Sequence, residues 1–162
     1  MILRPAEARD APAVAAIWNP VIRETAATFT TLEKTPDGLA SDFAVRAAEG
    51  KLFLLAEEAG ELLGFATYFQ FRNGPGYART MEHSIILAPA ARGRGVGRAL
   101  MAALEDHARA AGVHSLWAGV SAENSAGIAF HRSVGFAEVA RLPEVGHKFG
   151  RWMDLVLMQK IL

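Results

Sequence analysis

The sequence predicts an α/β fold in which helices flank a mixed, mostly antiparallel central sheet. Two features of the chain lead to this prediction. Apolar stretches of strand length alternate with amphipathic stretches of helical spacing, and at several places consecutive strands are joined by a short turn. A chain of 162 residues that is 51% hydrophobic can bury a sizeable core. We therefore expect residues 1–162 to form a single domain.

The N-terminal part of the chain is expected to form a short strand and a helix. Residues 2–4 are partly apolar and predict the strand. Asp10 is a suitable N-cap and Pro12 suits the first turn, so a helix should begin there. Apolar residues at helical spacing continue to Ile22. Pro20 interrupts this pattern, and we expect a kink or a break at that residue.

A loop, a second helix and a hairpin are expected next. Residues 26–31 are rich in Thr and Phe, which is typical of extended or loop structure. Residues 35–50 begin with Thr-Pro-Asp, carry a moderate apolar face and end in glycine, so they predict a helix. Two apolar strands at 52–57 and 62–69 flank a short turn and predict a β-hairpin. Residues 71–77 then form a loop with polar and aromatic groups.

The second half of the chain continues the alternation of strands and helices. A strand at 80–88 leads into a glycine-rich loop. The apolar positions of residues 96–111 fall on one helical face, and Gly112 closes that helix. Residues 116–120 predict a buried strand.

The C-terminal elements are a short helix and two strands. The helix covers residues 126–131, with Asn124 or a neighbour as its cap. A strand then runs through Leu142, followed by a loop that includes residues 143–148. Residues 151–161 predict the final strand.

The composition excludes several classes of function. Lys plus Arg and Asp plus Glu both number 17, so no overall field attracts nucleic acid or an anionic membrane. There is no cysteine, which excludes disulfides, thiolate metal sites and a cysteine nucleophile. The first residues lack the apolar core of a signal peptide, and no apolar run is long enough to span a bilayer. We expect a cytoplasmic protein with no nucleic-acid, membrane or metal partner.

The loop before residues 96–111 has the features of an anion site. It carries three glycines at alternate positions and three arginines, in the order Arg92, Gly93, Arg94, Gly95, Val96, Gly97 and Arg98. The glycines leave backbone N–H groups uncovered at a helix N-terminus, where a phosphate or pyrophosphate binds well. The alternative is a glycine-rich turn whose arginines are solvated. The strand before the loop and the helix after it favour the anion site.

The loop does not fit two well-known nucleotide motifs. A Walker loop ends in Gly-Lys-Ser or Gly-Lys-Thr, whereas Gly97 is followed by Arg98 and Ala99. A dinucleotide fingerprint requires G-x-G-x-x-G, and Arg98 stands where its last glycine would fall. The pattern that remains is R-x-x-G-x-G, formed by Arg92, Gly95 and Gly97. It resembles the pyrophosphate loop of the GNAT acetyltransferases, which bind acetyl-CoA.

The acetyl transfer that this resemblance implies needs a base for the amine, and Glu82 is the candidate. Glu82, His83 and Ser84 are polar residues in an otherwise apolar strand. Burial of Glu82 would raise its pKa and make it a better proton acceptor. The alternative is a structural ion pair with Arg72 or Arg79. Strand alternation puts His83 on the opposite face, where it either lines the site or lies under the helices.

The oxyanion and the leaving thiolate need partners as well. Backbone N–H groups of the same strand, at Ile85, Ile86 and Leu87, are expected to serve the oxyanion and the cofactor. Asn124 and His131 resemble a second GNAT block, in which an asparagine contacts the pantetheine arm and a tyrosine often protonates the thiolate. His131 stands at the tyrosine position, and a histidine can donate a proton near neutral pH. The alternatives are a plain helix cap for Asn124 and a packing role for His131.

Nearly the whole chain resembles the phosphinothricin N-acetyltransferase branch of the GNAT family. The late block Gly-His-Lys-Phe-Gly-Arg-Trp-Met-Asp at 146–154 is its most specific feature. The resemblance implies a GNAT fold splayed at the acetyl-CoA site, acetyl-CoA as cosubstrate and a homodimer. It also implies direct acetylation of the α-amine of a small amino acid or analogue, such as phosphinothricin, methionine sulfoximine or methionine sulfone. Acetylation of another amine, on a protein N-terminus or an antibiotic, and a non-catalytic acyl-CoA sensor are the alternatives.

The branch also implies a set of substrate-binding residues. These are Arg72, Asn73, Gly74, Glu82, His83 and Ser84. The guanidinium of Arg72 can bind a carboxylate or phosphinate through two hydrogen bonds, and the alternative is a solvated loop arginine. Lys148 and Arg151 are expected to close on the acidic end of the substrate or to bridge a dimer. Phe149 and Trp152 are expected in the core or at an interface.

Overall fold

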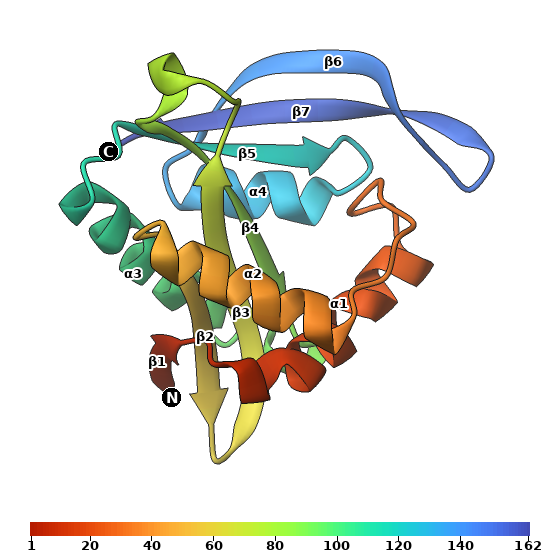
Figure 1. The fold of residues 1–162 in the computed structure, drawn as a ribbon. Coiled ribbons are helices and arrows are strands. Elements are labelled where there is room, and N and C mark those ends of the chain that lie inside the picture. Colours follow the sequence, from red (N-terminus) through yellow and green to blue (C-terminus); the bar gives the residue numbers. More distant parts are fainter.

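The computed structural model describes residues 1–162 and shows one seven-stranded sheet flanked by helices (Figure 1). The strands are β1 (Ile2–Pro5), β2 (Phe53–Glu58), β3 (Glu61–Gln70), β4 (Thr80–Leu87), β5 (Ser115–Ser121), β6 (Ala137–Lys148) and β7 (Arg151–Ile161). They lie in the order β1-β2-β3-β4-β5-β7-β6. Every pairing is antiparallel except the parallel pairing of β4 with β5, so the predicted mixed, mostly antiparallel sheet is confirmed.

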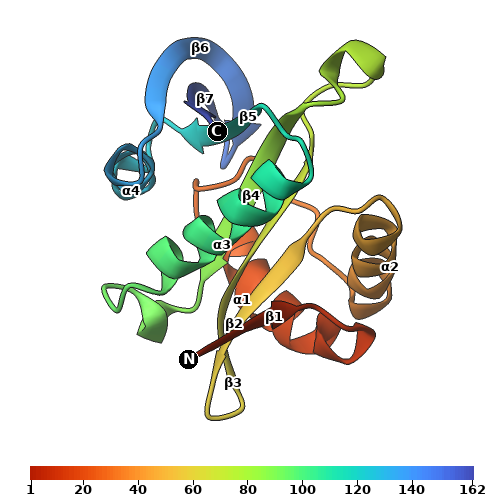
Figure 2. The same ribbon diagram turned by 90° about the vertical axis from the view of Figure 1, so that its left-hand side faces the viewer.

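The helices cover both faces of the sheet (Figure 2). They are α1 (Ala11–Glu24), α2 (Pro36–Ala48), α3 (Val96–Ala110) and α4 (Ser125–Ser133), with short 3₁₀ turns η1 (Ala8–Asp10), η2 (Pro75–Tyr77) and η3 (Pro89–Ala91). The larger core lies beneath α3 and includes Leu100 and Leu104. A smaller core beneath α1 and α2 is built around Phe43, Phe53 and Phe65. Each amphipathic helix therefore buries its apolar face against one side of the sheet.

The divergence of β4 from β5 positions the functional site. The two strands pair only where residues 80–82 meet residues 115–117. Beyond that point β4 continues beside β3, whereas β5 continues beside β7. Figure 1 shows the two halves of the sheet running in different directions from this point. The edge of β4 that faces β5 thus lacks a strand partner from residue 83 onward.

The expectation of a kink or a break at Pro20 is wrong in one part, the break. α1 is not broken there and continues to Glu24. Proline removes the N–H that would bond the carbonyl group of Ala16, but Ala16 is exposed and water can take that place. The apolar face of the helix, which includes Val14 and Ile22, is buried on both sides of the proline.

The expected loop at residues 143–148 is wrong, because β6 runs through this stretch to Lys148. The ladder between β6 and β7 shifts register between Leu142 and Gly146. An irregularity of this kind accommodates Pro143, which has no N–H to donate to a regular ladder. The sequence showed the proline but not the bulge that absorbs it.

Other elements agree with the expectations from sequence. The Oγ1 atom of Thr35 accepts a hydrogen bond from the Gly38 N–H at 3.1 Å and caps α2. α3 ends before Gly112, whose φ of 77° lies in the left-handed region that favours glycine. The hairpin of β2 and β3 forms as predicted. No helix of the chain combines the length and the apolar character needed to cross a membrane.

Candidate active site

Two adjoining cavities open where β4 and β5 diverge. The first, the Glu82 cavity, has a volume of about 290 Å³ and is lined by both strands, by α1 and by the loop after α1. The second, the Arg92 cavity, has a volume of about 430 Å³ and extends toward the glycine-rich loop. Both cavities are lined by Ala27, Ile85, Ile86, Asn124 and His131. The two spaces therefore meet at a junction that the divergence of the sheet creates.

Glu82 projects from β4 across the gap toward β5. Its Oε1 atom lies 3.2 Å from the place that a Cβ atom on Gly119 would occupy, so the glycine makes room for the carboxylate. Burial raises the pKa of Glu82, and no hydrogen bond or ion pair counters that effect. The alternative of a structural ion pair with Arg72 or Arg79 is therefore not what the structure shows. Ser84, two residues further on the same strand, lines the same cavity.

His83 points from β4 to the opposite face, where it meets His131 of α4, and it also lines the Glu82 cavity. The Nε2 atoms of the two imidazoles are 3.0 Å apart. The Nδ1 atom of His83 lies 3.0 Å from the carbonyl oxygen of Trp117, and the Nδ1 atom of His131 lies 2.7 Å from that of Gly127. Burial, with a smaller contribution from His131, lowers the pKa of His83 to about 3. Burial also lowers the pKa of His131, so both rings resist protonation.

Asn124 caps α4 and also lines both cavities. Its Oδ1 atom accepts a hydrogen bond from the Gly127 N–H at 2.9 Å and caps α4. The cap fixes the first turn of the helix, and His131 lies about two turns after Asn124. Asn124 also lines both cavities, so the cap does not exclude contact with a bound molecule.

The glycine-rich loop presents an open helix N-terminus. Gly93 and Gly95 adopt φ values of 74° and 80°, which favour glycine, and a Cβ atom at either position would meet nothing within 4 Å. Gly95 is the N-cap of α3 and has no side chain to satisfy the first N–H groups of the helix. A Cβ atom on Gly97 would lie 3.1 Å from the Phe130 ring, so this glycine lets α3 and α4 approach.

The three arginines of this loop have different partners. Arg92 lines the Arg92 cavity together with Gly93. Arg94 forms an ion pair with Glu58 at 2.5 Å, at the end of β2. Arg98 donates a hydrogen bond to the carbonyl oxygen of Ser133 at 3.2 Å and joins α3 to α4. Of the three arginines, only Arg92 lines the cavity.

The unpaired edge of β4 supplies backbone donors. The Ala88 N–H donates to the Leu63 carbonyl at 2.8 Å. This bond shows which N–H groups of β4 are directed to β3 and which are directed away from it. Because hydrogen-bonded positions alternate along an antiparallel ladder, the N–H of Ile86 is directed to β3. The N–H groups of Ile85 and Leu87 are then directed to the gap. The geometry favours these two residues over Ile86 as donors to a bound group.

The wall of the Glu82 cavity opposite β4 was not found from sequence. It consists of Trp18 of α1 and of Ala27, Thr28 and Phe29 from the loop that follows. A Cβ atom on Gly146 would lie within 2.6 Å of the Phe29 ring, so this glycine lets the ring pack against β6. The stretch carries no periodic or charged signal that would mark it as part of a site.

Lys148 holds this wall in place and does not reach a cavity or the surface. Its side chain is buried, and its Nζ atom donates hydrogen bonds to the carbonyl oxygens of Ile22, Thr25 and Thr28 at 2.5, 2.6 and 2.8 Å. Burial lowers the pKa of Lys148. The carbonyl oxygens oppose that effect because they stabilise the charged form. The expectation that Lys148 contacts substrate or bridges a dimer is therefore wrong for this chain.

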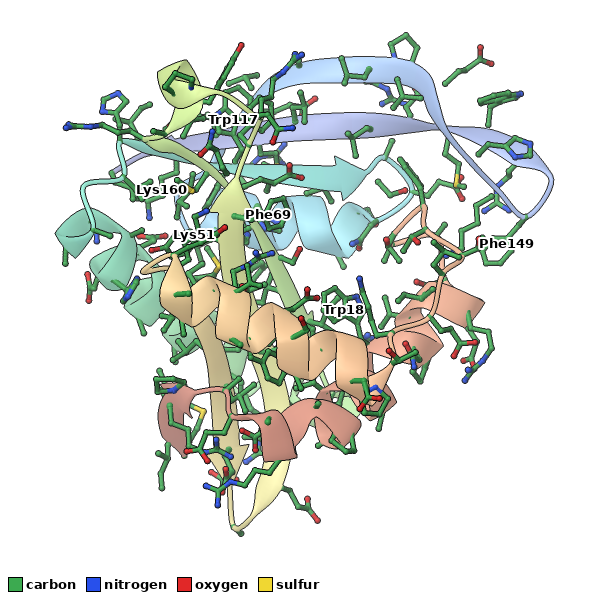
Figure 3. The ribbon with its side chains drawn as sticks, in the orientation of Figure 1. Trp18, Lys51, Phe69, Trp117, Phe149 and Lys160 are labelled. Atoms are coloured by element: carbon green, nitrogen blue, oxygen red, sulfur yellow. The ribbon has the colours of Figure 1, made fainter.

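The remaining residues of the late block lie outward. Arg151 forms an ion pair with Glu123 at 2.6 Å. Phe149 and Trp152 are 52% and 62% exposed, so neither belongs to the core of the chain. Figure 3 shows Phe149 at the turn between β6 and β7, far from Lys160 near the other end of β7.

The expected substrate loop stands apart from both cavities. Arg72 is exposed, and its guanidinium group lies 5.8 Å from the centre of the Tyr77 ring. Neither Arg72 nor Asn73 nor Gly74 lines the Glu82 cavity or the Arg92 cavity. Figure 1 shows the turn η2 and its loop projecting beyond the end of β4. Contact with a substrate would require this loop to approach the site.

Comparison with known proteins gives consistent results. The profile of the acetyltransferase (GNAT) family matches residues 18–136. The L-methionine sulfoximine/L-methionine sulfone acetyltransferase of Salmonella typhimurium is 38% identical over 159 residues, which cover 98% of this chain and 93% of the relative. A solved ribosomal-protein-alanine N-acetyltransferase from Brucella melitensis is 41% identical, with a TM-score of 0.96 and coverage of 100% of both chains. The yncA protein of Salmonella typhimurium, solved with its cofactor acetyl-CoA, is 38% identical, with a TM-score of 0.96 and coverage of 100% of this chain and 94% of the other.

Proposed function

The chain belongs to the acetyltransferase (GNAT) family, and from that premise we propose that it transfers the acetyl group of acetyl-CoA to the α-amine of a small amino acid or amino-acid analogue. Phosphinothricin, methionine sulfoximine and methionine sulfone are the analogues that the sequence resemblance suggests. One observation carries the proposal: an unpaired carboxylate lies in one cavity, a helix N-terminus without a side-chain cap borders the other, and the two cavities share a junction.

Acetyl-CoA is assigned to the Arg92 cavity. Its diphosphate suits the uncovered N–H groups at the start of α3 and the guanidinium group of Arg92, because both favour an anion. Its pantetheine arm carries amides that can pair with the free edge of β4. The N–H groups of Ile85 and Leu87 then serve the thioester carbonyl, where negative charge develops during attack.

Glu82 is assigned as the general base. The amine of the acceptor attacks the thioester directly, and its proton passes to the carboxylate, either directly or through one water molecule. A pKa raised by burial makes Glu82 a better proton acceptor at neutral pH. His131 lies at the junction of the cavities, where it can act on the leaving thiolate.

A small acceptor fits the Glu82 cavity better than a polypeptide does. The cavity has a volume of about 290 Å³, and Trp18 and Phe29 line the wall opposite β4. A protein N-terminus needs an open groove that accepts an extended chain. The name of the Brucella melitensis neighbour nevertheless makes a peptide with N-terminal alanine the second candidate acceptor.

A thiol-release assay across an acceptor panel tests the proposal. The panel contains free amino acids, methionine sulfone, methionine sulfoximine, phosphinothricin and a peptide that begins with alanine. We expect turnover on one or more of the small acceptors and none above background on the peptide. Tight binding of acetyl-CoA without turnover on any amine would instead identify an acyl-CoA sensor.

Glu82→Gln tests the base within the same assay. Removal of a general base lowers kcat by about 10²–10⁴-fold, while acetyl-CoA binding should be retained. Glu61→Gln, at the exposed start of β3 and outside both cavities, is the matched control. Turnover of Glu82→Gln within a few-fold of the parent across the pH range would remove Glu82 from this role.

The proposal includes a homodimer that forms through β6 and β7. Six large apolar side chains are exposed on this hairpin: Val139, Leu142, Val145, Phe149, Trp152 and Ile161. A group of exposed apolar side chains of this kind is typical of an interaction surface. Light scattering during size-exclusion chromatography should give twice the mass of one chain, and Trp152→Lys should shift the protein toward the monomer.

A further inference from the structure

The contacts of His83 and His131 require more N–H donors than two neutral imidazoles carry. Three contacts lie within hydrogen-bonding distance in a row: the Trp117 carbonyl with His83, His83 with His131, and His131 with the Gly127 carbonyl. A carbonyl oxygen cannot donate, so each outer contact requires an N–H on the imidazole. The central contact requires a third N–H. Two neutral rings carry only two.

A neutral pair must therefore contain one contact without a hydrogen. If both Nδ1 atoms are protonated, the two Nε2 lone pairs of His83 and His131 face each other at 3.0 Å. If one Nε2 is protonated, a Nδ1 lone pair faces a carbonyl oxygen at 2.7 or 3.0 Å. Each arrangement is repulsive, because both imidazoles are buried and the facing atoms lie too close together for a water molecule between them. Only a pair with three N–H groups satisfies every contact.

The surroundings decide which ring carries the additional proton. His83 lines the Glu82 cavity but not the Arg92 cavity, and the centre of its ring lies 5.3 Å from that of Phe136. His131 lines both cavities and so faces the space in which an anion would be bound. A positive charge is less costly beside an anion than in the apolar interior. The additional proton therefore belongs on His131.

Few other charged groups can compensate this proton. Glu82 lines the same cavity but projects from the other face of β4, and Arg92 lines the second cavity. On α4 and β6, Arg132 and Glu138 pair with each other at the surface, 3.8 Å apart. β5 carries no charged residue, and Arg98 of α3 bonds the carbonyl oxygen of Ser133 at the end of α4. The bound anion is therefore the main partner for a charged His131.

We propose that His83 is a positioning residue that accepts a hydrogen bond from Nε2 of His131 and thereby holds His131 as an imidazolium when the diphosphate of coenzyme A enters the Arg92 cavity, which His131 lines. His83 stays neutral, with its Nδ1–H donated to the Trp117 carbonyl. Proton uptake by the pair is thus coupled to the arrival of coenzyme A. No covalent bond changes in this step, since one proton is taken from solvent and placed on one nitrogen.

The consequence for catalysis rests on the proposed acetyl transfer, whereas the proton placement does not. When the thioester breaks, the leaving sulfur becomes a thiolate. A fixed imidazolium at the junction of the cavities stabilises that charge through its field. His83 would influence the rate without touching either substrate, because it sets the protonation state of the residue that does.

Nitrogen-15 NMR of histidine-labelled protein tests the proton placement directly. The chain has five histidines, and single variants assign their signals. With coenzyme A bound near neutral pH, or without it at acid pH, we expect only one of the four imidazole nitrogens of the pair to lack a hydrogen. That nitrogen is Nε2 of His83. If the Nε2 atoms of both residues lacked a hydrogen throughout the pH range, or if His83 carried the additional proton, the proposal would be overturned. The measurement on free protein needs neither binding nor turnover, so it stands if the proposed function fails.

Calorimetry in buffers of different ionisation enthalpy tests the coupling. Binding of coenzyme A should take up about half a proton or more in the parent near neutral pH, as linkage requires when an anion raises a proton affinity. His83→Phe removes the acceptor and should abolish this part of the uptake. His83→Gln offers an oxygen that accepts from Nε2–H and should retain a substantial share of it. His114→Phe, at an exposed position, is the matched control.

Kinetics give the last test. The alkaline limb of the pH profile of kcat should move to lower pH by about one unit in His83→Phe, because the imidazolium of His131 loses its hydrogen-bond acceptor. It should move less in His83→Gln. Equal proton uptake and the same pH profile in the parent, His83→Phe and His83→Gln would contradict the proposal, whatever the absolute rates.

Discussion

Replacing Lys148 by methionine separates the wall of the Glu82 cavity from the hairpin that holds it. Methionine fills a similar volume but donates no hydrogen bond. The change therefore removes three donors from the carbonyl oxygens of Ile22, Thr25 and Thr28. Those carbonyl groups lie at the end of α1 and in the loop that lines the cavity.

The size of the effect follows from the burial of the three acceptors. A buried acceptor left without a partner costs about 1–3 kcal/mol. Ile22 is buried, whereas Thr25 and Thr28 are half-buried and can turn their carbonyl groups to water. Removal of a buried ammonium group, whose pKa burial lowers, offsets part of the loss. We expect a net loss of about 2–4 kcal/mol, which lowers Tm by roughly 5–12 °C for a chain of this length.

The assay combines thermal denaturation with thiol-release kinetics. Because the released loop lines the Glu82 cavity, the acceptor KM should rise on the order of ten-fold, while the KM for acetyl-CoA changes little. Lys160→Met is the matched control: Lys160 bonds both carboxylate oxygens of Glu105 and the Val134 carbonyl, and it lines neither cavity. It should lower Tm without changing the acceptor KM. A Lys148→Met protein with parental Tm and parental acceptor KM would refute this account of the wall.

Three further variants or conditions test separate parts of the site. Gly119→Ala places a methyl group 3.2 Å from Oε1 of Glu82 and should lower kcat several-fold with little change in Tm, as steady-state rates and melting curves would show. Arg92→Gln should raise the KM for acetyl-CoA and reduce its dependence on salt concentration, whereas Arg98→Gln, whose partner is Ser133, should mainly lower Tm. Because burial raises the pKa of Glu82 and only the ionised form accepts a proton, kcat/KM should fall as pH falls through a value above 4.5, and Glu82→Gln should lack this limb in a pH–rate series.

Local patterns predicted those parts of the site that depend on neighbours in the sequence. Alternation along β4 is a property of the backbone, so the opposite orientations of Glu82 and His83 could be deduced and are confirmed. The loop over residues 92–98 could be recognised because its glycines and the following helix are contiguous. The same holds for Asn124, whose cap involves residues of its own turn.

Contacts between distant segments could not be predicted from those patterns. His83 and His131 are separated by 48 positions, and their meeting depends on how α4 packs against the sheet. Lys148 bonds carbonyl groups more than a hundred residues earlier, so nothing near it in the sequence indicates a buried lysine. Arg94 and Arg98 looked equivalent to Arg92, but their partners lie on β2 and α4. In each case the deciding interaction comes from tertiary packing.

A crystal structure of the protein with acetyl-CoA tests the central claim most directly. The account predicts the diphosphate on the N–H groups at the start of α3 beside Arg92, and the thioester at the junction between Glu82 and His131. A diphosphate bound away from residues 92–98, or an acetyl group that the Glu82 carboxylate cannot reach directly or through one water molecule, would contradict it.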